Sequence, residues 1–379
     1  MMTTHVFVVD EITFRCHLKY LFAGTGAKDK DVDFNGTPTS TLYPPKKYAA
    51  EAGLVAMMSD CSRLRDGDLV LFYLRSGSGR DGMFFGVFQV VGDPFLERTG
   101  IKQYLLSELN KNLTFRVRIA PYMVFPRGIT EWQALDEIRN LTSPNQMLWS
   151  LIYRKLRGNR GNTMITIYET ERIVDLLRRE NGNRTLGISV AYDFVNGEIV
   201  PMSTSSCYTG MMTPFDILPR LIQKHSARKA YEAHLQMYIV QNIGRNPSID
   251  NALGISDNVE WIGNEVACGV GMQRIDIMVS KSDGPLDRVV MPIELKAVPA
   301  DESNITQISR YVDWVEQYYV PNRISAIQPV LICSSGGLTA SMKNRIISFN
   351  QAANGRYLPL RYIEYDVINN SLIFTNISY

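Results

Sequence analysis

The feature that most constrains the fold of this chain is a change of pattern near residue 216. Before that point, short apolar runs rich in strand-forming residues alternate with glycine-rich turns. After it, helical and strand-like segments follow one another in turn, which is typical of an α/β domain. At roughly 100–200 residues per domain, a chain of 379 residues has room for two. We therefore predict two domains of different architecture.

The composition argues against several classes of protein. Apolar residues make up 45% and charged residues 21% of the chain, so each half can bury an ordinary core. No run of about 18 apolar residues is present, which predicts no membrane-spanning helix. The first residues lack the apolar stretch of a signal peptide, which favours a cytoplasmic protein. The 5 cysteines form no CxxC pair and the 4 histidines no HExxH motif, so we expect neither a disulfide framework nor a zinc site.

Residues 1–182 predict a small α+β domain. Strands are expected at LVLFYLR and MFFGVFQVVGD, joined into a hairpin by the turn SGSGRDG, and at TFRVRIAPYMVF. Helical periodicity is present in ITEWQALDEIRNL and in TIYETERIVDLLRREN, which ends at Asn181-Gly182, a typical helix C-cap. Residues 183–215 are rich in Ser, Thr, Gly and Asn and predict a short hairpin and a linker.

Residues 216–379 predict an α/β domain with a mixed sheet flanked by helices. One long helix fits RLIQKHSARKAYEAHLQMYIVQNI, and two shorter ones fit NITQISRYVDWVEQYY and ASMKNRIISFNQAAN. Strands fit MQRIDIMVS, RVVMPIELKAV and QPVLICSS, with SDGPLD as the turn between the first two. A final hairpin is expected to turn at Asn369-Asn370.

The segment PIELKAV carries the residues that point to chemistry. Because side chains alternate along a strand, Glu294 and Lys296 share one face. Asp276 lies in the preceding strand, and pairing of the two strands can bring it beside Glu294. One or two carboxylates suffice for magnesium, which prefers oxygen ligands and keeps several waters. A nearby lysine can orient the water that attacks a phosphodiester.

A Glu-x-Lys pair on a strand is by itself common and is usually an exposed ion pair. Asp276 on the neighbouring strand favours a catalytic site instead. Gln307 and Tyr311 also favour it, because they lie four residues apart on one face of the next helix, although such a pair is ordinary amphipathic surface in many proteins.

These residues resemble a known motif. Asp276, followed further along by Glu294-Leu295-Lys296, resembles the PD-(D/E)xK nuclease motif. The elements YEAHLQMYIVQNI, GMQRIDIMV, PIELKAVPAD and QISRYVDWV are similar in order and spacing to NucS-type mismatch endonucleases, over residues 225–335. The resemblance implies a restriction-endonuclease-like fold, a divalent metal (Mg²⁺ or Mn²⁺) and DNA cleavage. It also implies that Asp276 and Glu294 bind the metal, that Lys296 is the catalytic lysine, and that Glu232 is the helix acid near the metal.

By the same resemblance, Gln307 matches the glutamine that follows the Glu-x-Lys strand, and Tyr311 matches the next tyrosine, which we assign to DNA binding. The chain departs from the family at Pro292, just before the Glu-x-Lys residues. A second departure is that the N-terminal half does not resemble the DNA-binding half of NucS, so a mismatch substrate does not follow from the resemblance.

The N-terminal half resembles a different group. The hairpin DGDLVLFY…GMFFGVFQVV and the segment LWSLIYRKLRGNRGNTMITIYETERIVDLL are similar to EVE, YTH and PUA-like β-barrel modules, over residues 1–180. This resemblance implies a nucleic-acid reader that holds a flipped base among aromatic side chains. Candidate pocket walls are Phe14, Tyr73, Trp132 and Trp149, although aromatics in a small domain are usually core residues. Candidate phosphate contacts are Arg154, Lys155, Arg157 and Arg160, for which a solvated loop is the alternative.

Taken together, the sequence favours a magnesium-dependent endonuclease of restriction type that acts on double-stranded DNA and depends on modified bases. Ordinary sequence-specific restriction and NucS-like mismatch or branched-DNA repair are alternatives. A nucleic-acid-binding protein that does not cleave, and an RNA-processing enzyme, are others. Because cutting both strands usually takes two active sites, we expect a homodimer.

Overall fold

In the computed structural model the chain forms two compact units, and the first changes to the second between Phe215 and Asp216. The segment expected to be a hairpin and linker, residues 183–215, belongs to the first unit. No helix in the described parts of the chain is long and apolar enough to cross a membrane. The structure describes residues 3–26, 48–77, 79–97, 102–149, 162–204, 208–255, 259–268, 273–282, 287–321 and 325–379.

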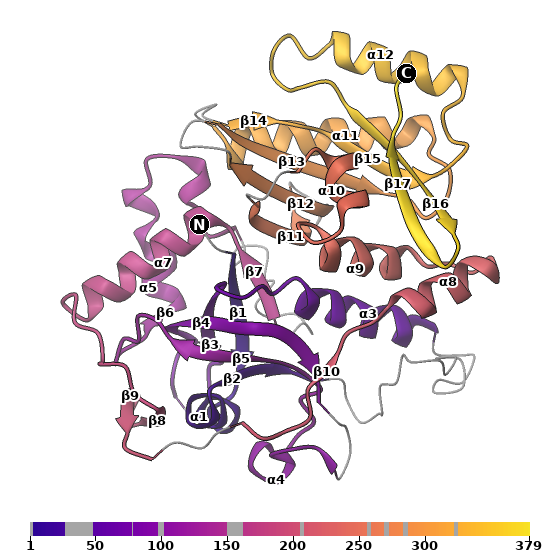
Figure 1. Ribbon diagram of the computed structural model, residues 1–379. Coiled ribbons are helices and arrows are strands. Elements are labelled where there is room, and N and C mark those ends of the chain that lie inside the picture. Colours follow the sequence, from indigo (N-terminus) through magenta and orange to yellow (C-terminus); the bar gives the residue numbers. More distant parts are fainter. Residues whose placement is uncertain are drawn as a thin grey trace. The chain divides into compact units, whose positions relative to one another are not determined.

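The first unit is an α+β structure (Figure 1, indigo to magenta). Its helices are α1 (Glu11–Tyr20), α3 (Tyr48–Ser62), α4 (Leu106–Leu109), α5 (Glu131–Asp136), η3 (Glu137–Asn140), η4 (Pro144–Gln146) and α7 (Ile167–Glu180). Its strands are β1 (Thr4–Val9), β2 (Phe22–Thr25), β3 (Leu69–Leu74), β4 (Met83–Leu96), β5 (Phe115–Pro121), β6 (Ile129–Thr130), β7 (Asn162–Ile165), β8 (Ala191–Val195), β9 (Glu198–Met202) and β10 (Thr213–Pro214).

The main sheet of the first unit has the strand order β2-β5-β4-β3-β1-β7, and the short strands β6 and β10 pair with β4. The predicted β-barrel is not closed in the described residues. Closure needs a continuous ring of hydrogen-bonded strands, but β2 pairs with β5 and β7 with β1, and no ladder between β2 and β7 is present there. The domain is therefore described as an open sheet with helices.

Local signals in the first half place most of its elements correctly. The hairpin of β3 and β4 forms as predicted, with Tyr73 opposite Phe84. Helix α7 begins after its N-cap residue Thr166, which forms a capping box with Glu169 in the first turn. The helix ends with Asn181 as its C-cap, as the sequence indicates. The hairpin expected between residues 183 and 215 is β8–β9.

The second unit contains a mixed sheet with helices (Figure 1, orange to yellow). Its helices are α8 (Leu218–Ser226), α9 (Glu232–Asn242), α10 (Pro247–Leu253), α11 (Glu302–Trp314), which continues into the π-helical turn η6 (Val315–Tyr319), and α12 (Ala340–Gln351). Its strands are β11 (Val259–Ala267), β12 (Arg274–Ser282), β13 (Arg288–Leu295), β14 (Ser325–Ile327), β15 (Val330–Ser334), β16 (Arg361–Ile368) and β17 (Ser371–Asn376).

The sheet of the second unit has the order β11-β12-β13-β15-β16-β17, with β14 beside β13. The first three strands are antiparallel, β13, β15 and β16 are parallel, and β17 returns antiparallel. Helix α11 contacts β13, β15 and α12, whereas α9 contacts β11 and β12. This is the mixed sheet flanked by helices that the sequence predicts.

Pro292 departs from the motif family but fits this sheet. Proline cannot donate a ladder hydrogen bond, so it is tolerated where a neighbouring strand is interrupted. On one side of β13, β14 pairs up to Val290 and β15 pairs from Ile293 onward. Pro292 lies between these two pairings, where an N–H group is not required.

The single long helix expected across residues 220–243 is two helices, so that prediction is wrong. Arg228 has φ 51°, which is left-handed. The N–H of Lys229 donates to the carbonyl oxygen of Lys224 at 2.9 Å, and that of Arg228 to His225 at 3.0 Å. This pair of hydrogen bonds is a Schellman motif, which ends α8 at Ser226. Helix α9 then begins at Glu232.

The final hairpin turns at Asn369 and Asn370, as predicted, with φ values of 50° and 59°. Ile368 and Ser371 are opposite each other, so the loop has these two residues only. We expect Asn370→Ala to lower the free energy of unfolding by about 1 kcal/mol, because alanine is strained at a left-handed φ. Asn370→Gly should be at least as stable as the wild type. Urea denaturation of the full chain checks this, and equal midpoints for the two variants would contradict the assignment.

Candidate active site

The end of the β12–β13 ladder brings the two predicted metal-binding carboxyls together. The last residue pair of this antiparallel ladder is Ile277 opposite Ile293. Asp276 and Glu294 are the next residues on their strands. Beyond that pair, a side chain replaces the backbone as the hydrogen-bond acceptor between the two strands: Oδ2 of Asp276 accepts the N–H of Leu295 at 2.9 Å. The strand pairing inferred from the sequence therefore places these carboxyls side by side.

Both carboxyls are held in a poorly solvated environment. Glu294 is fully buried and Asp276 is partly buried, and the two carboxyls lie close enough to affect each other's ionisation. Burial raises the pKa of Asp276 well above its usual range, and the charge on Glu294 raises it further. Burial also raises the pKa of Glu294, although its ion pair with Lys296 opposes the change. Like charges this close favour a shared proton or a bound cation.

Lys296 and Glu232 complete the group of charges. The Nζ atom of Lys296 is 2.6 Å from Oε1 of Glu294. Burial alone would lower the pKa of Lys296, but the ion pair with Glu294 outweighs it and the pKa is raised. Glu232, at the exposed start of α9, accepts the N–H of Ala297 through Oε2 at 3.4 Å and adds negative charge near the lysine. Four of the predicted site residues therefore lie together.

Tyr311 supports the carboxyl pair rather than facing solvent, and its predicted role in DNA binding stays a prediction. Its side chain is buried, and its hydroxyl lies 2.8 Å from Oε2 of Glu294 and 2.8 Å from the carbonyl oxygen of Arg274. Gln307 donates to the same hydroxyl at 2.7 Å. The Tyr311 hydroxyl therefore accepts from Gln307 and shares its one proton between Glu294 and the carbonyl oxygen of Arg274.

The donor set fits a hard divalent cation. Within the described residues no group of three or more His, Cys, Asp or Glu side chains is arranged to hold a metal. Magnesium needs only one or two carboxylates, because it keeps several of its waters. Asp276 and Glu294 meet that requirement, and a cation between them would offset the negative charge of Glu294 that, together with burial, raises the pKa of Asp276.

Sequence reasoning missed three side chains that fix the ends of the site strands. Tyr231 donates to the carbonyl oxygen of Ala297 at 2.9 Å, and Tyr365 donates to the same oxygen at 3.1 Å. Gln236 of α9 donates to the carbonyl oxygen of Asp276 at 2.9 Å. These contacts join residues from 40 to 68 positions apart in the chain, so no local pattern signals them.

The structure does not place the proposed base-stacking aromatics as walls of one pocket. Phe14 is fully buried in the core of the first unit, with its ring centroid 5.2 Å from those of Phe85 and Phe194. It has no open face for a base, so that assignment is corrected. Tyr73 is also buried, and its hydroxyl donates to Oε2 of Glu131 at 2.7 Å.

The other two aromatics differ from these. Trp132, on α5, is 51% exposed, and Trp149 is partly buried next to residues that the structure does not describe. The predicted phosphate contacts all lie outside the described residues, namely Arg154, Lys155, Arg157 and Arg160. The reader site in the first unit stays a prediction.

Comparison with known proteins does not assign the chain to a family. No family model matches the chain, and no curated protein matches it. A hypothetical protein from Leishmania major is 12% identical, covers 48% of this chain and 97% of its own, and has a TM-score of 0.30. A Pseudomonas putida protein is 14% identical, with 46% and 99% coverage and a TM-score of 0.26. Human THYN1, solved in complex with DNA containing 5-methylcytosine, is 10% identical, with 46% and 98% coverage and a TM-score of 0.27. TM-scores this low do not establish a shared fold.

The raised pKa of Asp276 predicts how stability depends on pH. A carboxyl whose pKa is raised on folding binds more protons in the folded state, so stability falls as pH rises above the unfolded value of about 3.9. Asp276→Asn removes this cost and keeps an oxygen that can accept from Leu295. Without divalent cations, we expect this variant to melt above the wild type at pH 7, with the gap shrinking as pH falls toward 4. Thermal melts from pH 5 to 8 measure this, and a gap that does not change with pH would argue against the buried pair.

Proposed function

We propose that the second unit is a magnesium-dependent nuclease that hydrolyses phosphodiester bonds in double-stranded DNA. The observation that carries this proposal is the pairing of the partly buried Asp276 with the fully buried Glu294, with the ammonium group of Lys296 2.6 Å from Glu294. A buried pair of like charges is costly for a protein that uses it only as structure. The same pair is useful where a cation and a phosphate must meet.

Each side chain has a role that its contacts support. Asp276 and Glu294 would hold Mg²⁺ or Mn²⁺, which supplies charge neutralisation at the phosphate and favours ionisation of the attacking water. Lys296, partly exposed beside them, would orient that water and stabilise developing charge. Gln307 and Tyr311 hold Glu294 in place through the hydrogen bonds at 2.7 and 2.8 Å. Glu232 would keep Lys296 protonated.

The finer assignment rests on the sequence. The resemblance of residues 1–180 to EVE and PUA-like modules supports a reader domain, and with it restriction of DNA that carries modified bases. The likeness of residues 225–335 to NucS-type endonucleases supports mismatch repair as a second candidate. The presence of Asp276, Glu294 and Lys296 favours cleavage over a binding-only role, because a degenerate nuclease would be expected to lose one of them. Cutting both strands calls for two sites, which favours a homodimer.

Cleavage of a DNA panel by matched variants tests the proposal. The panel holds unmodified, cytosine-methylated and mismatched duplexes and an RNA duplex, each with Mg²⁺ or Mn²⁺. We expect Asp276→Asn to slow cleavage by roughly a thousandfold or more, because several kcal/mol of transition-state stabilisation are lost. Asp287→Asn makes the same charge change directly before Arg288, the first residue of β13, at the opposite end of that strand from Glu294. This variant should cleave DNA like the wild type.

The preferred duplex would separate restriction, modification-dependent restriction and repair. Cleavage by Asp276→Asn at the wild-type rate would sink the proposal. Wild-type protein that binds these duplexes but cuts none of them would replace it with the binding-only role, and cleavage of RNA alone would replace it with RNA processing.

Tyr311→Phe tests whether the hydroxyl positions Glu294. Groups that orient a metal-binding side chain are typically worth 10–100-fold in metal affinity or activity. We therefore expect roughly 10–100-fold weaker Mn²⁺ binding by calorimetry, with DNA binding in EDTA unchanged. Tyr357→Phe is the control, because the hydroxyl of Tyr357 donates to the carbonyl oxygen of Phe349 instead. Unchanged Mn²⁺ affinity in Tyr311→Phe would mean that the hydroxyl does not position the carboxylate.

A further inference from the structure

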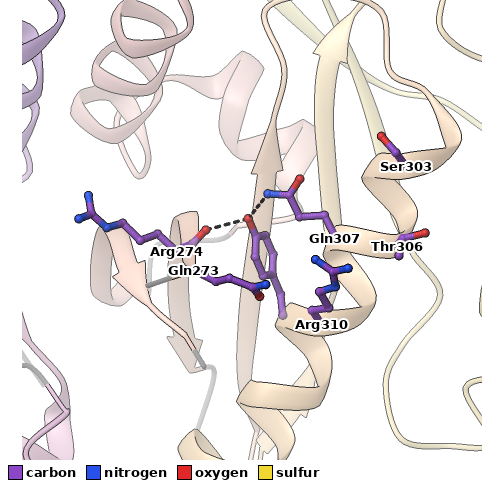
Figure 2. A pocket seen from close by; sticks show the side chains of 7 residues that line it. Gln273, Arg274, Ser303, Thr306, Gln307 and Arg310 are labelled. Atoms are coloured by element: carbon purple, nitrogen blue, oxygen red, sulfur yellow. Dashed lines mark hydrogen bonds between the residues drawn. The ribbon is translucent and has the colours of Figure 1, made fainter. Parts of the chain in front are cut away.

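A pocket of ≈ 480 Å³ adjoins the carboxyl pair in the second unit. One side is an exposed face of α11, where the lining residues recur at helical spacing, and the other is the beginning of β12 (Figure 2). The residues that line it are Gln273, Arg274, Ser303, Thr306, Gln307, Arg310 and Tyr311. Its volume falls within the range of about 300–1,000 Å³ that is typical of ligand sites.

The lining is rich in hydrogen-bond donors and carries positive charge. It includes two guanidinium groups and two side-chain amides, and none of the described residues that line it is acidic. Arg274 forms an ion pair with Glu265 at 2.9 Å, so part of its charge is already neutralised. Arg310 is exposed and has no ion-pair partner among the residues that the structure describes. Arg310 is therefore the strongest available contact for an anion.

The pocket and the carboxyl pair share a wall. Tyr311 lines the pocket, and its hydroxyl is 2.8 Å from Oε2 of Glu294. Figure 2 shows Gln307 and the backbone of Arg274 converging on that hydroxyl from the two sides of the pocket. A group bound in the pocket would consequently lie next to a phosphate held at Asp276 and Glu294.

We propose that this pocket binds a neighbouring phosphate of the DNA strand that is cut, with Arg310 as its main contact. The inference rests on the proposed function, because it assigns the strand to the site of Asp276 and Glu294. A guanidinium group makes two parallel hydrogen bonds to a phosphate and suits an anion that must be held in one orientation. Gln273 and Thr306 supply further donors on either side. The contact fixes the position of the strand and carries no sequence preference.

Salt-dependent DNA binding by the full chain in EDTA tests the proposal without relying on cleavage. Each phosphate contact contributes about 0.9 to the slope of log K against log salt concentration. We expect Arg310→Ala to lower this slope by about 0.9 and to weaken binding. Lys343→Ala removes the same charge from an exposed position on α12, outside the pocket, and should keep the wild-type slope. Arg310→Lys should restore most of the slope, because it restores the charge.

The outcomes separate this proposal from that of the nuclease. A lower slope in Arg310→Ala alone supports the pocket, whether or not the wild type cleaves DNA. A wild-type slope in Arg310→Ala overturns it, even if Asp276→Asn abolishes cleavage. Equal losses in Arg310→Ala and Lys343→Ala overturn it too, because they indicate a general electrostatic field. Inorganic phosphate that binds the wild type in calorimetry but not Arg310→Ala, with no change in the DNA slope, would assign the pocket to free phosphate instead.

Discussion

The proximity of the partly buried Asp276 carboxyl to the fully buried Glu294 carboxyl is the constraint on which the site of the second unit depends. Asp276 and Glu294 meet where the β12–β13 ladder stops, and burial raises the pKa of both. The surrounding groups offset the repulsion in different ways: the N–H of Leu295 donates to Asp276, Lys296 forms an ion pair with Glu294, and Tyr311 holds its second oxygen. A protein keeps such an arrangement at a cost to stability, which is the usual condition of a functional site.

Tyr311 joins the carboxyl pair to the pocket beside it. Its hydroxyl contacts Glu294, Gln307 and the backbone of Arg274, so the beginning of β12 and the face of α11 are held at one point. A phosphate bound near Arg310 would thus lie close to a cation bound at Glu294. The nearness of the pocket to Glu294, and not its lining alone, is what links the pocket to the positioning of a DNA strand.

The first unit presents the opposite case, because its aromatic residues are used mainly for packing. Phe14 contacts Phe72, Phe85 and Phe194 in the core, and Tyr73 is buried against Phe84. Aromatic rings bury large apolar areas, so a small sheet needs them for stability before any can be exposed to a ligand. A reader function for this unit would rely on other residues, such as the exposed Trp132.

Local patterns in the sequence were enough to locate the β3–β4 hairpin, the end of α7, the turn at Asn369-Asn370 and the strand pairing that sets Asp276 beside Glu294. Those features depend on alternation and turn chemistry over a few residues. Only the tertiary structure showed that Phe14 is buried, that Tyr311 faces Glu294, and that distant tyrosines hold the carbonyl group of Ala297. Burial and long-range contacts depend on which faces pack together, and the spacing of residues along the chain does not specify that.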